Sequence, residues 1–562
     1  MRTSFPLLPL PLLLMVCCTQ LFAQTDSVRI ADVMRAFADW KPETDSLSWS
    51  VTTAESAARE AGRLRAIRER VPEPGKLDAA GRLNRNLLLH VLDDAIYQRE
   101  FGAWMFPLDA EGGFLTTVVY RLVNRRVTGE ADFVEYLKTL RDLPVFFERQ
   151  TINLRAGLAA GKTDPRIVVN NCLLLIDRQL ETPIGESIFP QPVLNDTARA
   201  RVVEKLVETE VYPAYRKLAD FLREEYLPGL RPGAGISGIT GGKAYYEQRV
   251  RYFTTDEVTP AEVFATGKAE VARIRAEMET VIRRTGFEGS FADFLTFLRT
   301  DEQFYAKMPA ELLAHAAWIT KRMEGKLPQY FNRLPRMPLT VAPVPDAFAP
   351  TYTTGRYSPG NYKTRKAGAF WVNTYDLPSR PLYVLPALAL HEGVPGHHTQ
   401  MMLATEMENV PAFRQNLYLS AFGEGWALYC EYLGREAGMY ETDYEEFGRL
   451  VYEMWRACRL VVDPGLHHFG WSRDKAVEFL ASNTALSLHE VNTEIDRYIG
   501  WPGQAVSYKM GELKIRELRK RAETRLGERF DLAAFHDLVL ANGAVTMRGL
   551  EGLFEVWLKD ME

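Results

Sequence analysis

The chain has 562 residues, with 68 Lys and Arg against 73 Asp and Glu, so its formal net charge is −5. This balance argues against a nucleic-acid binder that relies on overall basicity. Hydrophobic residues make up 46% and charged residues 25%, an ordinary globular composition that excludes wholesale disorder.

The N-terminus has the order of a secretory signal. Arg2 precedes an apolar run that three prolines interrupt, too short for a helix that spans a bilayer, which needs about 20 apolar residues. The small residue Ala23 suits cleavage, so residues 1–23 are predicted to be a signal peptide. A lipoprotein would use Cys17 or Cys18, but neither follows a small residue. We therefore expect an exported protein, periplasmic or secreted rather than lipid-anchored, without a transmembrane segment.

Export leaves three cysteines in the mature chain: Cys172, Cys430 and Cys458. All three stand in apolar or helical contexts, so we expect buried free thiols rather than a disulfide framework.

Apolar residues recur at three- and four-residue spacing along most of the chain, which predicts a mainly α-helical fold. The clearest helix begins at a capping box, Thr259 with Glu262, has Pro260 at its first position, and ends at Gly286. The predicted helices cover 199–227, 260–284, 309–324, 411–438, 442–462 and 505–526.

Two stretches depart from the helical pattern. Residues 229–243 hold six glycines and one proline, which indicates a loop or lobe boundary. Residues 367–374 are aromatic and β-branched, which predicts a strand, and we expect it to be a sheet edge that pairs with an extended peptide. The expected fold is two-lobed and metallopeptidase-like: 24–235 forms part of a deep cleft, and 236–562 is catalytic, with a small sheet beside the active-site helix.

Residues 391–398 carry the strongest chemical signal and read His-Glu-Gly-Val-Pro-Gly-His-His. A His-Glu pair followed by another His is the core of many zinc peptidase sites. The imidazoles hold the metal, and the adjacent Glu392 is placed to take a proton from water.

The spacing needs explanation, because zinc peptidases usually place two histidines four residues apart. On a helix, a His six residues after His391 points about 120° away, and one seven residues after lies about 10 Å along the axis. Pro395 breaks a regular helix, so a bulge at 394–396 could bring His397 beside His391. His398 remains an alternative ligand.

A third ligand is expected on a later helix. Glu424 and Glu431 share one face of an otherwise apolar helix, where a carboxylate is costly unless it is paired or metal-bound. Two His and one Glu leave a fourth zinc position for water, so we expect one Zn²⁺ per chain, held by His391, His397 and Glu424, with Glu431 as an alternative.

Four short strings follow one another along the chain: 391–398, 423–431, Asp463-Pro464-Gly465-Leu466-His467, and Pro502-Gly503-Gln504-Ala505 with Tyr508. In order and spacing they together resemble the bacterial domain-of-unknown-function family 885, from about residue 30 to 560. More distantly, the site is similar to helical zinc peptidases: the carboxypeptidase Taq, thimet oligopeptidase and angiotensin-converting enzyme group. Aligning their Gly-His on Gly396-His397 implies that His397 and Glu424 are ligands.

Those relatives use a Tyr or His to hydrogen-bond the oxyanion of the reaction. The resemblance therefore implies His467, Tyr498 and Tyr508 as catalytic candidates. Each Tyr is equally well explained as an amphipathic core residue, and His467 as a capping or surface residue after a helix end.

Four further residues are candidates for substrate binding. A cationic side chain near the tyrosines could fix a terminal carboxylate, which would make the protein a carboxypeptidase or dipeptidase. The candidates are Arg497, Lys509, Tyr246 and Asn373.

The sequence thus predicts an exported zinc peptidase that hydrolyses short peptides. The alternatives are a zinc hydrolase of a non-peptide amide or ester, and a binding protein whose cleft holds a ligand without catalysis. The oligomeric state is left open.

Overall fold

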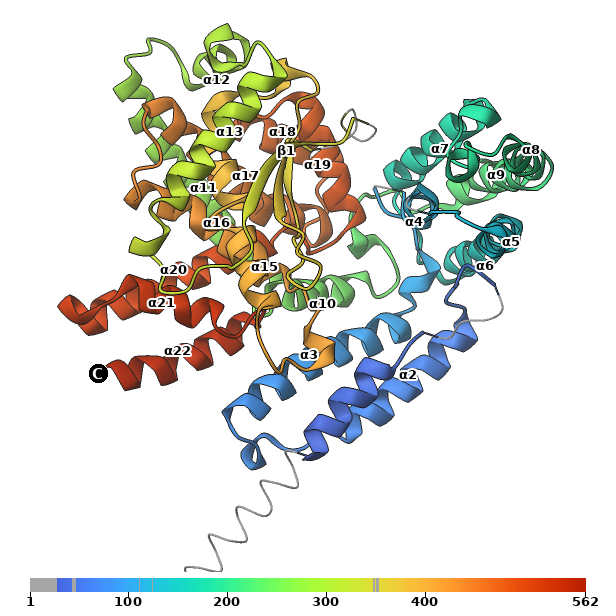
Figure 1. Ribbon diagram of the computed structural model, residues 1–562, viewed down its shortest axis with the longest axis horizontal. Coiled ribbons are helices and arrows are strands. Elements are labelled where there is room, and N and C mark those ends of the chain that lie inside the picture. Colours follow the sequence, from blue (N-terminus) through green and yellow to red (C-terminus); the bar gives the residue numbers. More distant parts are fainter. Residues whose placement is uncertain (1–27, 43–46, 111, 124, 347–348, 350–352) are drawn as a thin grey trace, which may run out of the picture. The chain divides into compact units, whose positions relative to one another are not determined.

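The computed structural model describes residues 28–42, 47–110, 112–123, 125–346, 349 and 353–562. It is mainly helical and its described part contains a three-stranded sheet, which confirms the predicted class (Figure 1). The predicted signal peptide, 1–23, lies outside the described residues. Within the described ranges, no helix combines the length and apolar character needed to cross a membrane.

The chain forms two compact units. The smaller comprises the described parts of Met1–Glu43, together with Thr52–Trp104 and Glu408–Leu417, and the larger holds the rest. The predicted boundary at 235–236 falls inside the larger unit.

The smaller unit is built on a helix pair, α2 (Ala54–Glu69) and α3 (Ala79–Phe101). Leu64 and Leu88 are fully buried between them. The segment 408–417 joins this unit because the Phe413 ring packs edge-on against Phe37, with 6.2 Å between ring centroids.

The first helices of the larger unit enclose an aromatic and aliphatic core of their own. The predicted helix 199–227 is present, but π-helical turns at Val207–Val211 and Leu222–Tyr226 divide it. These helices are α4 (Phe114–Val123), α5 (Glu130–Arg141), α6 (Leu143–Ala160), α7 (Arg166–Glu181), α8 (Thr197–Leu206) and α9 (Tyr212–Phe221).

The later helices carry the candidate site. α11 has the predicted Thr259 capping box and a left-handed Gly286 at its end. The helices are α10 (Gly242–Thr254), α11 (Pro260–Thr285), α12 (Phe291–Thr300), α13 (Pro309–Glu324), α14 (Leu385–Glu392), α15 (His397–Thr405), α16 (Ser420–Glu436), α17 (Asp443–His467), α18 (Arg473–Asn483), α19 (Leu488–Gly500), α20 (Ser507–Leu526), α21 (Leu532–Leu540) and α22 (Met547–Met561).

Two predicted helix boundaries are wrong, and both errors matter for the site. The helix predicted over 411–438 begins only at Ser420, because 408–417 packs in the smaller unit. The helix predicted to end at 462 continues to His467, with Pro464 inside its last turns. Asp463 and His467 therefore lie on α17 rather than after its end.

The sheet consists of β1 (Leu339–Pro343), β2 (Gly355–Ser358) and β3 (Gly368–Val372), in the order β1-β3-β2. β1 is parallel to β3 and β2 is antiparallel to it. The predicted strand exists, but its assignment as an edge is wrong: β3 is paired on both sides, and β2 is the edge strand next to α14.

A close helix crossing brings α20 against α16. A Cβ on Gly425 would lie 2.6 Å from the Gly511 carbonyl carbon, and a Cβ on Gly511 would lie 1.9 Å from the Ala421 oxygen. Only glycine permits this approach, which sets Tyr508 of α20 near Glu424 of α16.

Candidate metal centre

His391 and His397 meet across a break between two helices. α14 ends at Glu392, α15 begins at His397, and the turn between them contains a cis Val394–Pro395 bond. A Cβ on Gly396 would lie 2.0 Å from the His391 carbonyl oxygen, so this turn requires glycine. The imidazole centroids are 4.9 Å apart. The expected meeting thus occurs, through a new helix rather than a bulge in one helix.

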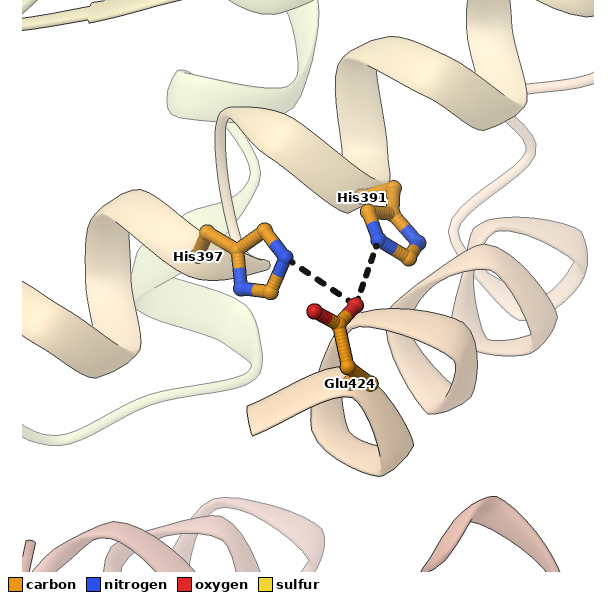
Figure 2. A group of neighbouring side chains, drawn as sticks. All are labelled: His391, His397 and Glu424. Atoms are coloured by element: carbon orange, nitrogen blue, oxygen red, sulfur yellow. Dashed lines mark ion pairs between the residues drawn. The ribbon is translucent and has the colours of Figure 1, made fainter. Parts of the chain in front are cut away.

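Glu424, on α16, completes a three-residue group (Figure 2). Its Oε2 lies 3.4 Å from His391 Nε2 and 3.5 Å from His397 Nε2. Zinc bonds of 2.0–2.2 Å in a tetrahedron imply about 3.3–3.5 Å between ligand atoms. The donor set fits zinc in chemistry, both Glu424–histidine spacings match this value, and the three ligand atoms lie within 4.8 Å of one another.

Glu431 lies behind His391 and is not a third-ligand candidate. Its Oε1 accepts a hydrogen bond from His391 Nδ1 at 2.7 Å. With Nδ1 bonded to Glu431, Nε2 is the ring nitrogen that faces Glu424 and would bind a metal. A carboxylate on the outer nitrogen is the usual support of a metal-binding histidine, which corrects the alternative role given to Glu431.

His398 is directed away from the group. Its Nε2 donates to the Met337 carbonyl at 3.0 Å, and its Nδ1 accepts from the Tyr357 hydroxyl at 3.1 Å. Burial lowers the pKa of His398 to about 4, so it is a neutral, fully hydrogen-bonded side chain. Of the two histidines, His397 and not His398 belongs to the group that could hold a metal.

The local electrostatics favour positive charge at the three-residue group. Burial lowers the pKa of His391, but hydrogen bonds with Glu424 and Glu431 outweigh it and raise this pKa to about 9. Burial also acts to raise the pKa of Glu424, yet the charge of His397 and the two histidine hydrogen bonds hold it well below its usual value. The carboxylates thus create a negative potential suited to a cation.

Glu392, the last residue of α14, is fixed beside the group. Its Oε2 accepts the backbone N–H of Tyr357 at 2.7 Å. The Glu392 charge contributes to the raised pKa of His391, which places the carboxylate close to the histidine. One Glu392 oxygen is therefore bonded to edge strand β2, while the charge of the carboxylate acts on His391.

Tyr418 is a site residue that sequence reasoning missed. Its hydroxyl donates to Glu424 Oε1 at 2.7 Å, the oxygen that does not face the histidines, and its side chain is 47% exposed. Its ring lies over Gly423, where a Cβ would be 2.6 Å from it. The predicted helix over 411–438 hid this contact, because residues six apart on a helix point about 120° from each other.

Tyr508 is the one oxyanion candidate that lies near the group. It is half-buried, and burial first and the Glu424 charge second raise its pKa. The Arg459 guanidinium lies over its ring, with Cζ 4.2 Å from the centroid.

The other two oxyanion candidates, His467 and Tyr498, belong to a separate buried group. It also contains Tyr246 and Asp463 and is named here the polar cluster. Ile236 N–H donates to His467 Nδ1 at 3.0 Å, and His467 Nε2 donates to the Tyr498 carbonyl at 2.9 Å. Burial lowers the pKa of His467 to about 3. Both ring nitrogens are used, so His467 has a structural role.

The hydroxyls of Tyr246 and Tyr498 likewise hydrogen-bond to other side chains of the protein. The Tyr246 hydroxyl donates to Asp463 Oδ1 at 2.6 Å, inside the cluster. The Tyr498 hydroxyl accepts from Trp455 Nε1 at 3.0 Å and from Arg459 Nε at 2.9 Å. Tyr246 is fully buried and Tyr498 nearly so, which corrects their assignments as substrate-binding and catalytic residues.

Lys509 is also structural. It is fully buried, and its ammonium contacts Glu453 and Glu512 at 2.8 Å and Glu270 at 3.1 Å. A lysine has three N–H donors, so three carboxylates leave none for a substrate.

The remaining substrate-binding candidates hold local structure. Arg497 contacts Glu494 and Gln504. Fully buried Asn373 donates to the Ala349 and Thr353 carbonyls at 2.9 and 3.2 Å. The cysteines, by contrast, are as expected: Cys172, Cys430 and Cys458 are free and buried.

Fold and site together define a mainly helical protein with a buried His₂Glu group supported by an outer carboxylate. The chain belongs to the family described as bacterial protein of unknown function (DUF885), whose model matches residues 42–553. No curated protein matches it.

Solved structures with the same fold cover almost the whole chain. "The crystal structure of the putative lipoprotein from Colwellia psychrerythraea" has a TM-score of 0.83 and 26% identity, over 96% of this chain and 98% of that one. A structure titled as a putative lipoprotein of unknown function from Shewanella oneidensis has a TM-score of 0.69 and 16% identity, over 96% and 99%.

Proposed function

We propose that this protein is an exported zinc-dependent peptidase that hydrolyses short peptides, within a two-lobed, cleft-containing fold of the helical metallopeptidase type. The observation that carries the proposal is the convergence of His391 Nε2, His397 Nε2 and Glu424 Oε2 from three helices, at spacings that match the edges of a zinc tetrahedron. The Glu392 carboxylate beside them is what distinguishes a catalytic centre from a structural one.

The chain's own groups have clear roles in such a reaction. A zinc ion at the site would activate water at neutral pH and polarise a carbonyl. Glu392 would take the proton from the attacking water and pass it to the leaving amine. Tyr508, half-buried near Glu424, is the side chain placed to donate to the developing oxyanion.

Edge strand β2 supports an extended substrate. The Tyr357 N–H points away from β3 and is bonded to Glu392, so a peptide beside β2 would pair with the remaining outward backbone groups of this strand. A peptide paired beside β2 would be bound through its main chain, which favours broad side-chain tolerance.

Two fold relatives are titled as putative lipoproteins, which supports export of this chain as well. Their titles also support lipid attachment at Cys17 or Cys18, which the sequence alone disfavoured. Mass spectrometry of the mature N-terminus distinguishes the two: a start near Gln24 indicates a released protein, and a diacylated cysteine indicates an anchored one.

The function is tested by metal analysis combined with a peptide-library digest. Purified protein should hold about one zinc per chain and cleave short peptides, with a folded protein left intact as control. Glu392→Gln keeps the shape but removes the base, so zinc should stay while turnover falls about 10²-fold or more. Unchanged turnover in this variant would refute the mechanism.

The same experiment separates the alternatives. Zinc-loaded protein that ignores the library but hydrolyses amide or ester dyes would be a non-peptide hydrolase. Zinc-loaded protein without any hydrolysis would be a binding protein.

A further inference from the structure

Two arginines on α17 stand beside the candidate centre and are almost completely buried. Arg456 is 5% exposed and Arg459 is 3% exposed. Their guanidinium carbons lie 4.6 and 4.7 Å from the Trp455 ring centroid, so they flank one indole. This group is named here the arginine pair.

A single side chain lies between each arginine of the pair and a proposed metal ligand. Arg456 Nη2 lies 3.6 Å from Glu431 Oε1, the oxygen that bonds His391. Arg459 lies across the Tyr508 ring, and the charge of Glu424 raises the pKa of Tyr508.

Both arginines keep a buried N–H without a partner. Among the residues that the structure describes, neither Arg456 Nε nor Arg459 Nη1 has a hydrogen-bond acceptor. A buried donor on a charged group is costly to leave unpaired, and native proteins rarely do so. Two such donors lie one helical turn apart next to the same site, so both are available to an anionic acceptor.

The carboxylates that contact the pair also contact other residues. Glu494 is shared, since it contacts Arg459 at 3.1 Å and Arg497 at 3.0 Å. Glu431 is shared between Arg456 and His391. Neither carboxylate is therefore dedicated to the pair, although Glu490 also interacts with Arg456 through its charge.

We propose that Arg456 and Arg459 form a carboxylate-binding subsite, and that the substrates are peptides with a free C-terminal carboxylate close to the cleaved bond. This rests on the proposed peptidase function and names its substrate class. Guanidinium groups suit carboxylates because they offer parallel N–H donors.

The first test varies the substrate and needs no mutant. One peptide with neutral side chains is compared as free acid and as C-terminal amide, with N-terminal acetylation as the matched control. We expect amidation to lower kcat/KM about 100-fold or more and acetylation to change it little. Equal rates for acid and amide would overturn the proposal.

A third peptide identifies the source of the carboxylate. It carries a C-terminal amide and a Glu side chain at its last position. If the terminal carboxylate is recognised, this peptide should be as poor as the neutral amide; recovery of the rate would overturn the C-terminal assignment.

The second test removes the donors. Arg459→Gln and Arg456→Gln should each reduce the acid-to-amide preference at least tenfold, and Arg459→Lys should keep part of it. Arg473→Gln, which breaks an ion pair between Arg473 of α18 and Asp496 of α19, should leave the preference unchanged. A full preference in both pair variants would overturn the assignment, and the substrate series still decides if they fail to fold.

Binding separates failure of this proposal from failure of the function. Zinc-loaded Glu392→Gln protein is titrated calorimetrically with the acid and the amide. Selective acid binding without turnover in the wild type would refute the peptidase and keep the subsite. Turnover without selectivity would refute the subsite alone.

Discussion

The candidate metal centre and the polar cluster contain the same kinds of residue, yet they differ in where their polar atoms point. Both bury imidazoles, carboxylates and tyrosines in the larger unit. In the polar cluster, His467 uses both ring nitrogens for backbone groups. In the metal centre, Glu431 accepts a hydrogen bond only from Nδ1 of His391. Nε2 of His391 therefore remains directed toward Glu424.

The difference shows that composition alone does not mark a site. A buried histidine with two protein partners has no free ring nitrogen, whereas two histidine nitrogens that converge on one carboxylate offer a place for a cation. The predictions below test this contrast, from the largest expected effect to the smallest.

Replacing a proposed ligand should abolish metal binding. His391→Ala, His397→Ala and Glu424→Ala should each lose zinc, because two remaining ligands cannot hold it at ordinary concentrations. The measurement is zinc per chain after dialysis.

His398→Ala is the matched control for the ligand variants, since it removes the neighbouring histidine without touching the group. It should keep zinc. Full occupancy in His397→Ala with loss in His398→Ala would show that the geometry assigns the wrong histidine.

Weakening the outer carboxylate should have an intermediate effect. Glu431→Gln keeps the volume but loses the charge that orients His391, and such changes typically cost 10–100-fold in metal affinity. Chelator competition measures the affinity. An unchanged value would mean that the His391–Glu431 hydrogen bond is incidental.

The polar cluster should respond to pH rather than to metal. Burial raises the pKa of Asp463 to about 7, despite hydrogen bonds from Tyr246 and Gly503. Between the unfolded pKa of about 4 and pH 7 the folded state holds a proton that the unfolded state has released. This contribution to stability is therefore complete below about pH 4 and is lost as the pH rises to 7.

Asp463→Asn mimics the protonated form and should remove this slope, which is at most about 1.4 kcal/mol per pH unit. Unfolding by urea between pH 5 and 7 measures it, with zinc content as the control reading. A variant with the wild-type slope would show that another group titrates.

The sequence predicted what depends on local signals. The helix over 260–284 and the strand at 367–374 follow from caps and β-branched residues, and the His391, His397 and Glu424 set follows from residue types near a Pro-Gly break. What it could not predict depends on long-range partners. Periodicity does not say that the strand is paired on both sides, or that Lys509 finds three carboxylates on three elements.

The smallest effect is expected at Tyr418, the residue that the sequence did not reveal. Its hydroxyl bonds the outer oxygen of Glu424, and we expect it to hold the carboxylate so that Oε2 alone faces the histidines. Tyr418→Phe removes this one hydrogen bond and leaves the ring in place, so it should weaken zinc binding only about 3–10-fold. Tyr375→Phe, at a 52% exposed tyrosine, is the matched control and should have no effect.

Gly423→Ala distinguishes positioning from the mere loss of a hydroxyl. Its Cβ would lie 2.6 Å from the Tyr418 ring, so the ring must move although the hydroxyl remains. We therefore expect the same loss of zinc affinity as in Tyr418→Phe, and the same change in the visible spectrum of the cobalt-substituted protein, since both variants free the second oxygen of Glu424. If Gly423→Ala binds zinc like the wild type while Tyr418→Phe does not, ring placement is irrelevant. If neither variant differs from the wild type, Tyr418 does not position Glu424.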